Sequence, residues 1–477
     1  MGAPFYAEYA MLFHEDTAFN DIANQFIWME KHARDPKTGL LYHAWDESKE
    51  QQWANKTTGA SPLFWARAMG WYSDALVDAL DYFPVNHPKR KALIDILNRL
   101  VNAVEKQQDK TTGLWYDIMN YNGPGKEKNY FEASASCQFT YAIAKGVRKG
   151  YLPAAKIAIA KKAYEGILKQ FIKEENGQTN LHGTVKVSGL GGKPYRDGSF
   201  TYYMSEPVIV NDPKGMGAFL LASYEMENVK TQAVGKGKTV LLDRYFNSEK
   251  KKDATGANIY WHYAWEERSH GGFYTLGNIF ENNGAKLASL DVAPTAANLK
   301  GASVYIIVDA DHKRDNPNPN YVAPTDVKAI SNWVKAGGTL LIMANDSNNC
   351  DLPHLNLLAG AFGVKFTDKS LNMVKNDTYE QGVVFPGENN PVFKTTKKMF
   401  LKEVSALEIK APAVANAVKD GDVIIATAVY GKGKVLIVGD PWLYNEYVDN
   451  RKLLPADFQN YKAAEDLVKW LLTPTKR

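Results

Sequence analysis

Cysteine is almost absent from the sequence, with only Cys137 and Cys350 among 477 residues. Because the two lie far apart in the chain, we expect neither a disulfide framework nor a cysteine-rich metal site. An excess of one charge is missing as well, since 57 Lys and Arg stand against 53 Asp and Glu and the basic residues are dispersed. This balance argues against nucleic acid or a membrane surface as a partner.

The sequence also lacks long hydrophobic runs, so no segment is long enough to cross a bilayer. Residues 1–15 have no charged start, apolar stretch or cleavage site of a signal peptide. They are typical of the middle of a helix with no cap before it, and we therefore expect an N-terminally incomplete chain. Its location stays open: periplasmic or secreted if a signal peptide precedes these residues, and otherwise cytoplasmic.

A change in the pattern of apolar residues divides the chain into a helical part, residues 1–230, and a part with strands, residues 235–477. The length is compatible with two or three domains. In the helical part, apolar residues recur every three or four positions. The helices predicted from this spacing cover 16–33, 61–83, 87–108, 132–150, 154–172 and 211–227.

These helices alternate in kind. Those at 61–83, 132–150 and 211–227 are rich in Ala, Gly and aromatic residues, as helices buried on most sides would be. Those at 87–108 and 154–172 carry Lys, Arg and Glu on one face. Alternating inner and outer helices predict an all-α toroid of paired helices.

One phrase occurs twice: "DPKTGLLYHAWD" begins at Asp35 and "DKTTGLWYDIMN" at Asp109, which is 109 − 35 = 74 residues later. Each copy follows an outer helix and leads to the next inner one. Gly39 and Gly113 can take the left-handed turn that closes the outer helix. The next residues then run extended, with alternate side chains toward the mouth of the toroid. A turn repeated by ancestry explains the shared residues, but only the first copy carries a histidine, His43.

The second part of the chain has short β-branched runs that alternate with helical stretches. The predicted strands cover 239–243, 304–309, 339–344, 422–430 and 434–439, and the predicted helices 273–284, 325–336 and 461–472. Buried strands separated by helices predict an α/β domain with a parallel or mostly parallel sheet. Asp309, Asp311, Asn345 and Asp346 fall just past two strand ends, where open α/β sheets place ligands. Ordinary loop polarity is the alternative.

The densest candidate site is the stretch 43–71. It interleaves four tryptophans with polar residues: Trp45, Trp53, Trp65 and Trp71 with His43, Asp46, Asn55 and Arg67. Aromatic rings stack on the CH faces of sugars, and short polar side chains bind sugar hydroxyls. An arginine suits the carboxylate of a sugar acid through a two-pronged contact. The alternative is that Trp65 and Trp71 are core residues, and that His43 and Asp46 only make loop hydrogen bonds.

A second polar group lies in the loop 189–215, which contains Arg196, Asp197, Tyr202 and Tyr203. Loops of this length in compact domains are usually functional, and we expect this one to line the same mouth. A β-flap that closes the toroid is compatible with that role. Motifs for zinc proteases, CxxC redox sites, phosphate loops and serine nucleophile elbows are missing.

Several segments of the first part resemble glycoside hydrolase family 105, the unsaturated rhamnogalacturonyl hydrolases, which are related to the unsaturated glucuronyl hydrolases of family 88. The quoted resemblance rests on "MGAPFYAEYA", "GLLYHAWDES", "SPLFWARAMGWY", "GLWYDIMN", "NYFEASASCQFTYAIAKG" and "GLGGKPYRDGSFTYYMSEPVIVNDPKGMGAFLLAS". It covers about residues 1–227 and implies an (α/α)6 barrel. The family begins upstream of this chain, so the resemblance also implies that part of the barrel, with an aspartate implicated in catalysis, is absent.

The resemblance implies an unusual hydrolysis. The substrate is a lyase product with a C4=C5 double bond in its terminal uronate. An acid/base aspartate protonates C4 while water adds at C5, and the hemiketal then opens and the glycosidic bond breaks. One group that acts in both directions needs a pKa near the working pH, hence a partly buried carboxyl. Neither a metal nor another cofactor is implied.

The family's active-site histidine corresponds to His43. Its acid/base aspartate belongs to the following loop, where this chain offers Asp46 and, in "WAN", Asn55 in place of the "WAD" of many relatives. An amide cannot shuttle protons, so an Asn55 at the catalytic position predicts a weak or inactive hydrolase. The remaining residues expected to bind substrate are Trp45, Trp65, Arg67, Trp71, Trp115, Arg196, Asp197 and Tyr202.

Residues 235–477 resemble a flavodoxin-like domain related to class I glutamine amidotransferases, without their cysteine nucleophile. We interpret this part as an accessory domain. The sequence therefore predicts an unsaturated-uronyl hydrolase whose partner is an unsaturated oligosaccharide. Two alternatives stay open: a carbohydrate-binding protein without catalysis, and a separate ligand or activity in the second domain. The oligomeric state is not predicted.

Overall fold

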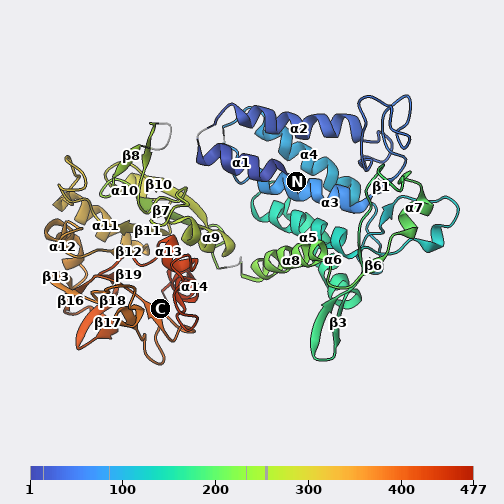
Figure 1. Cartoon of the computed structure of the whole chain (residues 1–477). Helices are drawn as coiled ribbons and strands as arrows, with labels where there is room; N and C mark the ends of the chain where they lie inside the picture. Colours follow the sequence, from blue (N-terminus) through green and yellow to red (C-terminus); the bar gives the residue numbers. More distant parts are fainter. Residues whose placement is uncertain (1, 14, 85, 232–233, 253–255, 476–477) are drawn as a thin grey trace. The chain divides into compact units, whose positions relative to one another are not determined.

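The structure is a computed structural model that describes residues 2–13, 15–84, 86–231, 234–252 and 256–475. The chain divides into two units, residues 1–230 and 231–477. Each unit is described by itself below (Figure 1). None of the described helices is both long and apolar enough to cross a membrane.

Helices dominate the first unit, as the apolar spacing predicts. They are α1 (Gly2–Leu12), α2 (Ala18–Ala33), α3 (Ala66–Ala79), α4 (Arg90–Glu105), α5 (Ala133–Arg148), α6 (Ile157–Gln170), α7 (Phe200–Ser205) and α8 (Pro213–Thr231). The most extensive contacts join α3 with α5 and α5 with α6. Nearly every residue of α5 is buried, whereas α4 buries one apolar face and exposes the other. The predicted difference between inner and outer helices is thus confirmed for α5 and α4. The predicted opening helix is α1; Met1 and His14 lie outside the described residues.

The first inner helix begins later than predicted, at Ala66 rather than at residue 61. The reason is a short antiparallel pairing of β1 (Phe64–Trp65) with β2 (Ile118–Met119), which keeps the residues before the helix extended. The Ala66 amide then donates to the carbonyl of Asp117. This pairing ties the loop after the first repeated turn to the loop after the second.

The two copies of the repeated phrase form matching turns. Asp35 accepts hydrogen bonds from the Thr38 amide and hydroxyl at 2.8 and 2.7 Å, and Asp109 accepts the corresponding bonds from Thr112 at 2.6 and 2.8 Å. The glycine of each copy has a φ of +77°, which confirms the left-handed turn. The shared residues are therefore explained by folding alone.

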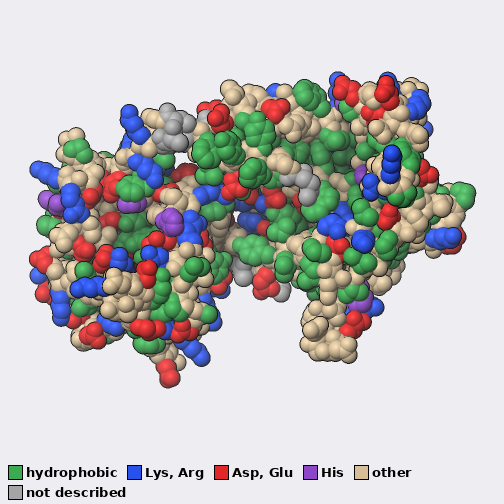
Figure 2. Space-filling view, in the orientation of Figure 1, with side chains coloured by type: hydrophobic (Ala, Val, Ile, Leu, Met, Phe, Trp, Pro, Cys, Tyr) green, Lys and Arg blue, Asp and Glu red, His purple; other side chains and the backbone are tan. Residues whose placement is uncertain are grey.

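Hydrophobic side chains are exposed on α1 and α2, on the face of this unit that Figure 2 shows. The largest are Phe5, Tyr9, Trp28 and Met29. The remaining strands of the unit form two small pairs, β3 (Ile172–Glu175) with β4 (Gln178–Leu181) and β5 (Thr184–Val185) with β6 (Val208–Ile209).

The second unit is built on a nine-stranded mixed sheet. Its strands are β7 (Thr239–Asp243), β10 (Lys286–Leu290), β11 (Val304–Val308), β12 (Thr339–Met343), β13 (Val364–Leu371), β16 (Val404–Ile409), β17 (Ala413–Lys419), β18 (Asp422–Tyr430) and β19 (Gly433–Val438). The order is β10-β7-β11-β12-β19-β18-β16-β13, with β17 paired to β18. Neighbours from β10 to β19 are parallel, and the pairs from β19 to β13 are antiparallel. A parallel or mostly parallel sheet was predicted, and the pairs from β10 to β19 agree with it. β18 departs from it because a tight turn joins it to β19, and such a turn permits only antiparallel pairing.

Helices cover both faces of this sheet (Figure 1). They are α9 (Tyr274–Asn282), α10 (Ala296–Leu299), α11 (Pro324–Ala336), α12 (Leu352–Gly360), α13 (Asn445–Val448) and α14 (Asn460–Leu472). Successive residues of β11 alternate between two cores: Ile306 packs with the cluster that includes α9 and α14, and Ile307 with the cluster that includes α11 and α12. Two small antiparallel pairs complete the unit: β8 (Lys250–Lys252) with β9 (Asn258–Tyr260), and β14 (Val383–Val384) with β15 (Met399–Phe400).

Candidate active site

The His43 side chain meets two aromatic residues from distant parts of the chain. Its Nδ1 lies 2.6 Å from the hydroxyl of Tyr203, and its ring centroid lies 4.5 Å from that of Trp65. Tyr203 is fully buried, so this hydrogen bond fixes the imidazole in one orientation. Burial lowers the pKa of His43 to about 4, which keeps the ring neutral at physiological pH. A neutral imidazole can accept a proton or donate a hydrogen bond to a ligand.

The second repeat supplies a residue to the same cluster. Asp117 stands 117 − 43 = 74 residues after His43, at the same place in the repeated phrase, and its Oδ1 accepts a hydrogen bond of 2.9 Å from Trp65 Nε1. The carboxyl is fully buried, and its Oδ2 has no hydrogen-bond partner among the described residues. Burial, and next the nearby charge of Glu132, raise the pKa of Asp117 to about 8. Asp117 was not predicted as a site residue, although it occupies the position of His43 when the two copies of the phrase are aligned.

The raised pKa of Asp117 predicts a pH-dependent stability. An unfolded aspartate ionises near pH 3.8, whereas the folded one keeps its proton to about pH 8, so the parent loses stability as pH rises between these values. Asp117→Asn keeps an acceptor for Trp65 and cannot ionise. We expect its free energy of unfolding, relative to the parent, to rise by about 1–4 kcal/mol between pH 4 and pH 7.

Urea unfolding at the two pH values measures this difference. Asp197→Asn is the matched control, because Asp197 is exposed and only holds the Ser199 amide of its own loop. An Asp117→Asn variant that tracks the parent at both pH values would show that the buried carboxyl is already ionised.

Beneath this cluster lies a buried ion pair. Arg67, in the first turn of α3, donates from Nη2 to Oε1 of Glu132 at 2.8 Å, and both side chains are at most 1% exposed. Glu132 is the N-cap of α5 and also accepts from the Ala135 amide, the Ser134 hydroxyl and the Val185 amide. The guanidinium lies 5.4 Å from the Trp65 ring. Arg67 therefore packs against Trp65 from the interior of the unit and is not exposed. The prediction that Arg67 binds the carboxylate of a sugar acid is thus corrected.

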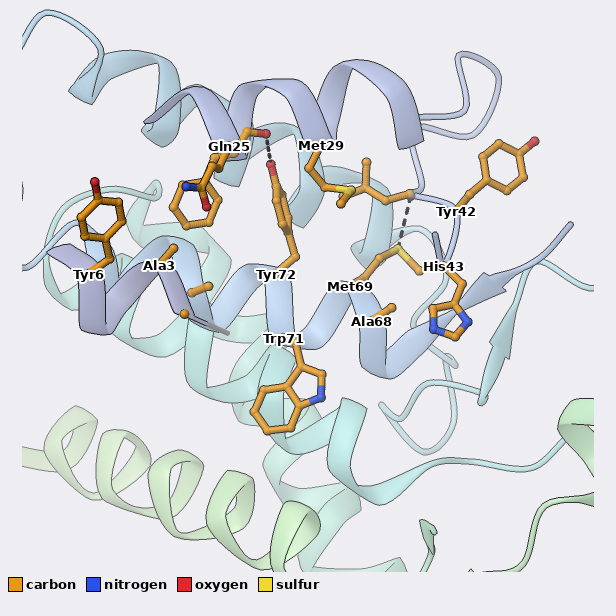
Figure 3. A pocket seen from close by; sticks show the side chains of 14 residues that line it. Ala3, Tyr6, Gln25, Met29, Tyr42, His43, Ala68, Met69, Trp71 and Tyr72 are labelled. Carbon is orange, nitrogen blue, oxygen red and sulfur yellow. Dashed lines mark hydrogen bonds between the residues drawn. The ribbon is translucent and has the colours of Figure 1, made fainter. Parts of the chain in front are cut away.

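A cavity of 540 Å³ opens beside His43. It is lined by residues of α1, α2, α3 and the first repeated turn, among them Tyr6, Met29, Tyr42, Trp71 and Tyr72. Figure 3 shows Met69 and Tyr72 pointing from α3 toward α2, with His43 at one end and the Trp71 ring pointing to the other side of α3. Of the aromatic residues predicted to bind substrate, Trp71 thus lines a cavity. Cavities of this size accommodate small-molecule ligands.

Asp46 and Asn55 hold their own loop. Asp46 accepts from the amides of Ser48 and Gln51, and these bonds, with that of Gln51 the strongest, lower its pKa. Asn55 is exposed and accepts from the amides of Thr57 and Thr58 at 2.9 Å each. These hydrogen bonds favour a structural role in the loop for both residues. The lowered pKa of Asp46 is also the opposite of what an acid/base carboxyl needs.

The other predicted residues are spread over three environments. Trp65 is only 8% exposed and forms the centre of the cluster, and Trp45 stacks on His32 and donates to the Thr58 carbonyl. Trp115 is fully buried and donates to the Val104 carbonyl, so its predicted contact with substrate is wrong. Its echo position, Leu41, is likewise buried, which marks this place in the turn as a core position.

The loop 189–198 folds against the loop 46–60. Arg196 donates to the Gly191 carbonyl, Tyr202 donates to the Gly189 carbonyl, and the Tyr195 hydroxyl accepts from the Trp53 amide. Arg196 and Tyr202 thus stabilise the flap, and Asp197 is exposed on it. Tyr203, which the sequence placed at the mouth, does reach the cluster. No group of three or more His, Cys, Asp or Glu that could hold a metal ion occurs in the part of the chain that the structure describes.

Comparisons with known proteins identify a matching family and several relatives of this chain. The model of the family described as Glycosyl Hydrolase Family 88 matches residues 1–230. The 24.9 kDa protein in the picA locus of Rhizobium radiobacter is 36% identical over 232 residues, which cover 47% of this chain and 97% of that protein. The unsaturated rhamnogalacturonyl hydrolase YesR of Bacillus subtilis is 29% identical over 143 residues, covering 30% of this chain and 38% of YesR.

Among solved structures, a glycoside hydrolase of family 105 from C. acetobutylicum is 52% identical, with a TM-score of 0.46. The match covers 47% of this chain and 62% of that protein. The chain therefore spans less than two thirds of the length of that structure and of YesR.

Proposed function

Because this chain belongs to glycosyl hydrolase family 88 through residues 1–230, we propose that it hydrolyses oligosaccharides ending in an unsaturated uronate. The proposal draws on YesR, whose name assigns it to unsaturated rhamnogalacturonyl substrates. In the proposed reaction a proton adds to C4 of the terminal uronate and a water oxygen to C5. The resulting hemiketal opens and releases the next sugar with a free hydroxyl.

The observation that carries this proposal is the neutral His43 at the end of a cavity. Its imidazole is held by Tyr203 and packs on Trp65, while its ring borders the 540 Å³ space. A neutral, oriented imidazole can hold the uronate or the attacking water by a hydrogen bond. The wall formed by Met29, Met69 and Tyr72 supports packing of sugar CH groups.

A second candidate function is binding without turnover. It is favoured by the lining of the cavity, in which the described side chains include no Asp or Glu. Protonation of C4 requires a proton donor, and Asp117 lies behind Trp65 rather than in the cavity lining. A chain that binds the unsaturated uronate through His43 but protonates it slowly would fit this geometry.

One experiment separates the two functions. The full chain is incubated with an unsaturated uronyl disaccharide, and loss of the ultraviolet absorbance of the double bond is followed while calorimetry measures binding. Loss of absorbance supports hydrolysis, and binding with constant absorbance supports the second candidate. Neither binding nor turnover would overturn both. A gain of turnover in Asn55→Asp would identify position 55 as the place of the proton donor.

For the second unit we propose a flavodoxin-like fold. The proposal is supported by the order of its parallel strands: β10-β7-β11-β12-β19 is the order 2-1-3-4-5 when these strands are counted along the chain. We propose that the second unit is an accessory domain of the hydrolase.

A further inference from the structure

A second cavity, of 610 Å³, lies within the second unit. Its lining includes Glu249, Trp261, His262, Asp309, Asn345 and Tyr444. Asp309 directly follows β11, and Asn345 follows β12 by two residues. The cavity therefore opens beyond the carboxyl ends of two neighbouring parallel strands.

The cavity also reaches the topological switch point of the sheet, because Glu249, in the segment after β7, lines it too. From β7 the chain adds β10 on one side of the sheet and then β11 on the other, so the loops after β7 and β11 diverge. Open α/β sheets bind their ligands in the crevice that such divergence leaves. The side chains at this crevice also point to a ligand.

Asp309 is the residue that points to a ligand. Its side chain is only 6% exposed, its Oδ2 accepts from the Tyr263 hydroxyl at 2.8 Å and from Asn345 Nδ2 at 3.3 Å, and it borders the cavity. Its Oδ1 has no hydrogen-bond partner among the residues that the structure describes. Leaving a buried polar atom unpaired is costly, and a ligand hydroxyl in the cavity would satisfy it. The residue also has a φ of +45°, a conformation that non-glycine residues adopt rarely and often at ligand sites.

The electrostatics of the cavity favour an uncharged ligand. Burial raises the pKa of Asp309 to about 7 and that of Glu249 to about 8, and burial lowers the pKa of His262 to about 4. At neutral pH Glu249 and His262 are therefore largely uncharged, whereas Asp309 is about half protonated. In its protonated form each carboxyl can both donate and accept a hydrogen bond. Asp315 and Glu446 also line the cavity, as does Lys251, whose ammonium lies 4.8 Å from the Trp261 ring. Two carboxyl groups against one ammonium disfavour phosphates and sugar acids.

We propose that this cavity binds an uncharged saccharide, whose hydroxyl groups pair with Asp309 and Asn345 while Trp261 forms an apolar wall. Donors and acceptors in close alternation, beside aromatic side chains, are the groups that recognise sugar hydroxyls and CH faces. The site differs in charge preference from the first unit, which is proposed to take an acidic sugar. It does not depend on turnover in that unit.

The test uses saturation-transfer NMR with the full chain and four single sugars. Galactose and rhamnose are the uncharged probes, galacturonate is the anionic probe, and glucosamine the cationic one. We expect saturable binding of an uncharged probe with a Kd on the order of millimolar. Galacturonate should bind at least about tenfold more weakly at this site, which corresponds to 1.4 kcal/mol.

Two variants localise the binding. Asp309→Asn preserves shape and tolerates the same backbone conformation, and Trp261→Ala removes the wall; each should weaken binding about tenfold or more. Asp368→Asn is the matched control, since Asp368 is exposed on β13 and should bind like the parent. Thermal unfolding of each variant checks the fold.

Three outcomes would overturn the proposal. They are no saturable binding of either uncharged probe, stronger binding of galacturonate or glucosamine, and binding that survives both Asp309→Asn and Trp261→Ala. Binding that is lost in His43→Ala but retained in these variants would assign the sugar to the first unit and would equally refute a site in the second.

Discussion

The Glu132→Gln variant is expected to lower the free energy of unfolding of the helical unit by about 3–5 kcal/mol. The substitution keeps the shape of the side chain but leaves the Arg67 guanidinium buried without a counter-charge. It also places an amide NH2 among groups that all donate, since the carboxylate accepts from Arg67, Ser134, Ala135 and Val185. The loss is large because both members of the pair are shielded from water.

Hydrogen exchange of peptides from α3 and α5 measures this effect in the helical unit alone, and urea unfolding gives its size. Asp95→Asn is the matched acid-to-amide control. It breaks the exposed pair of Lys91 and Asp95 and should cost less than about 1 kcal/mol. Equal losses in the two variants would mean that the buried pair contributes no more than a surface one.

Replacing His43 by alanine is expected to lower kcat/KM for unsaturated uronides about 10²–10⁴-fold, the usual range for losing a side chain that holds or moves a proton. If the chain binds without turnover, the same variant should instead raise the Kd for the disaccharide. The imidazole is neutral, oriented by Tyr203 and placed at the cavity, so its loss removes a directed polar contact. Absorbance kinetics and calorimetry give the two readouts.

His182→Ala is the matched control, because His182 pairs with Glu175 of β3 and is remote in sequence from the cavity lining. It should leave kcat/KM and Kd unchanged. If His43→Ala keeps its fold and has the kcat/KM and the Kd of the parent, the cavity of the first unit is not the substrate site.

The helices and strands followed from local patterns, because helical spacing and β-branched runs report directly which faces are buried. What the patterns missed depended on partners far away in the sequence. The first inner helix starts at Ala66 because β1 pairs with β2, more than fifty residues later. The mixed sheet was likewise hidden, since a β-branched run such as β18 looks the same in parallel and antiparallel neighbours.

The site was predicted only in part for a related reason. The sequence shows which residues could bind a sugar, but burial decides which of them reach one. Trp115 and Arg67 share the residue types of a binding site and are enclosed by the packing of the helices. Asp117 was overlooked because it is unremarkable by itself and gains its raised pKa only from complete burial beside Trp65.

Within each copy of the repeated phrase, different residues serve the turn and the candidate site. The aspartate and glycine of the phrase shape the bend. The eighth residue after that aspartate, His43 in one copy and Asp117 in the other, contacts the same indole, that of Trp65. Substitution of His43 or Asp117 can therefore change the polar group that contacts Trp65 without changing the conformation of the turn. The contact of both groups with one indole therefore depends on the β1–β2 pairing, which holds the two turns side by side.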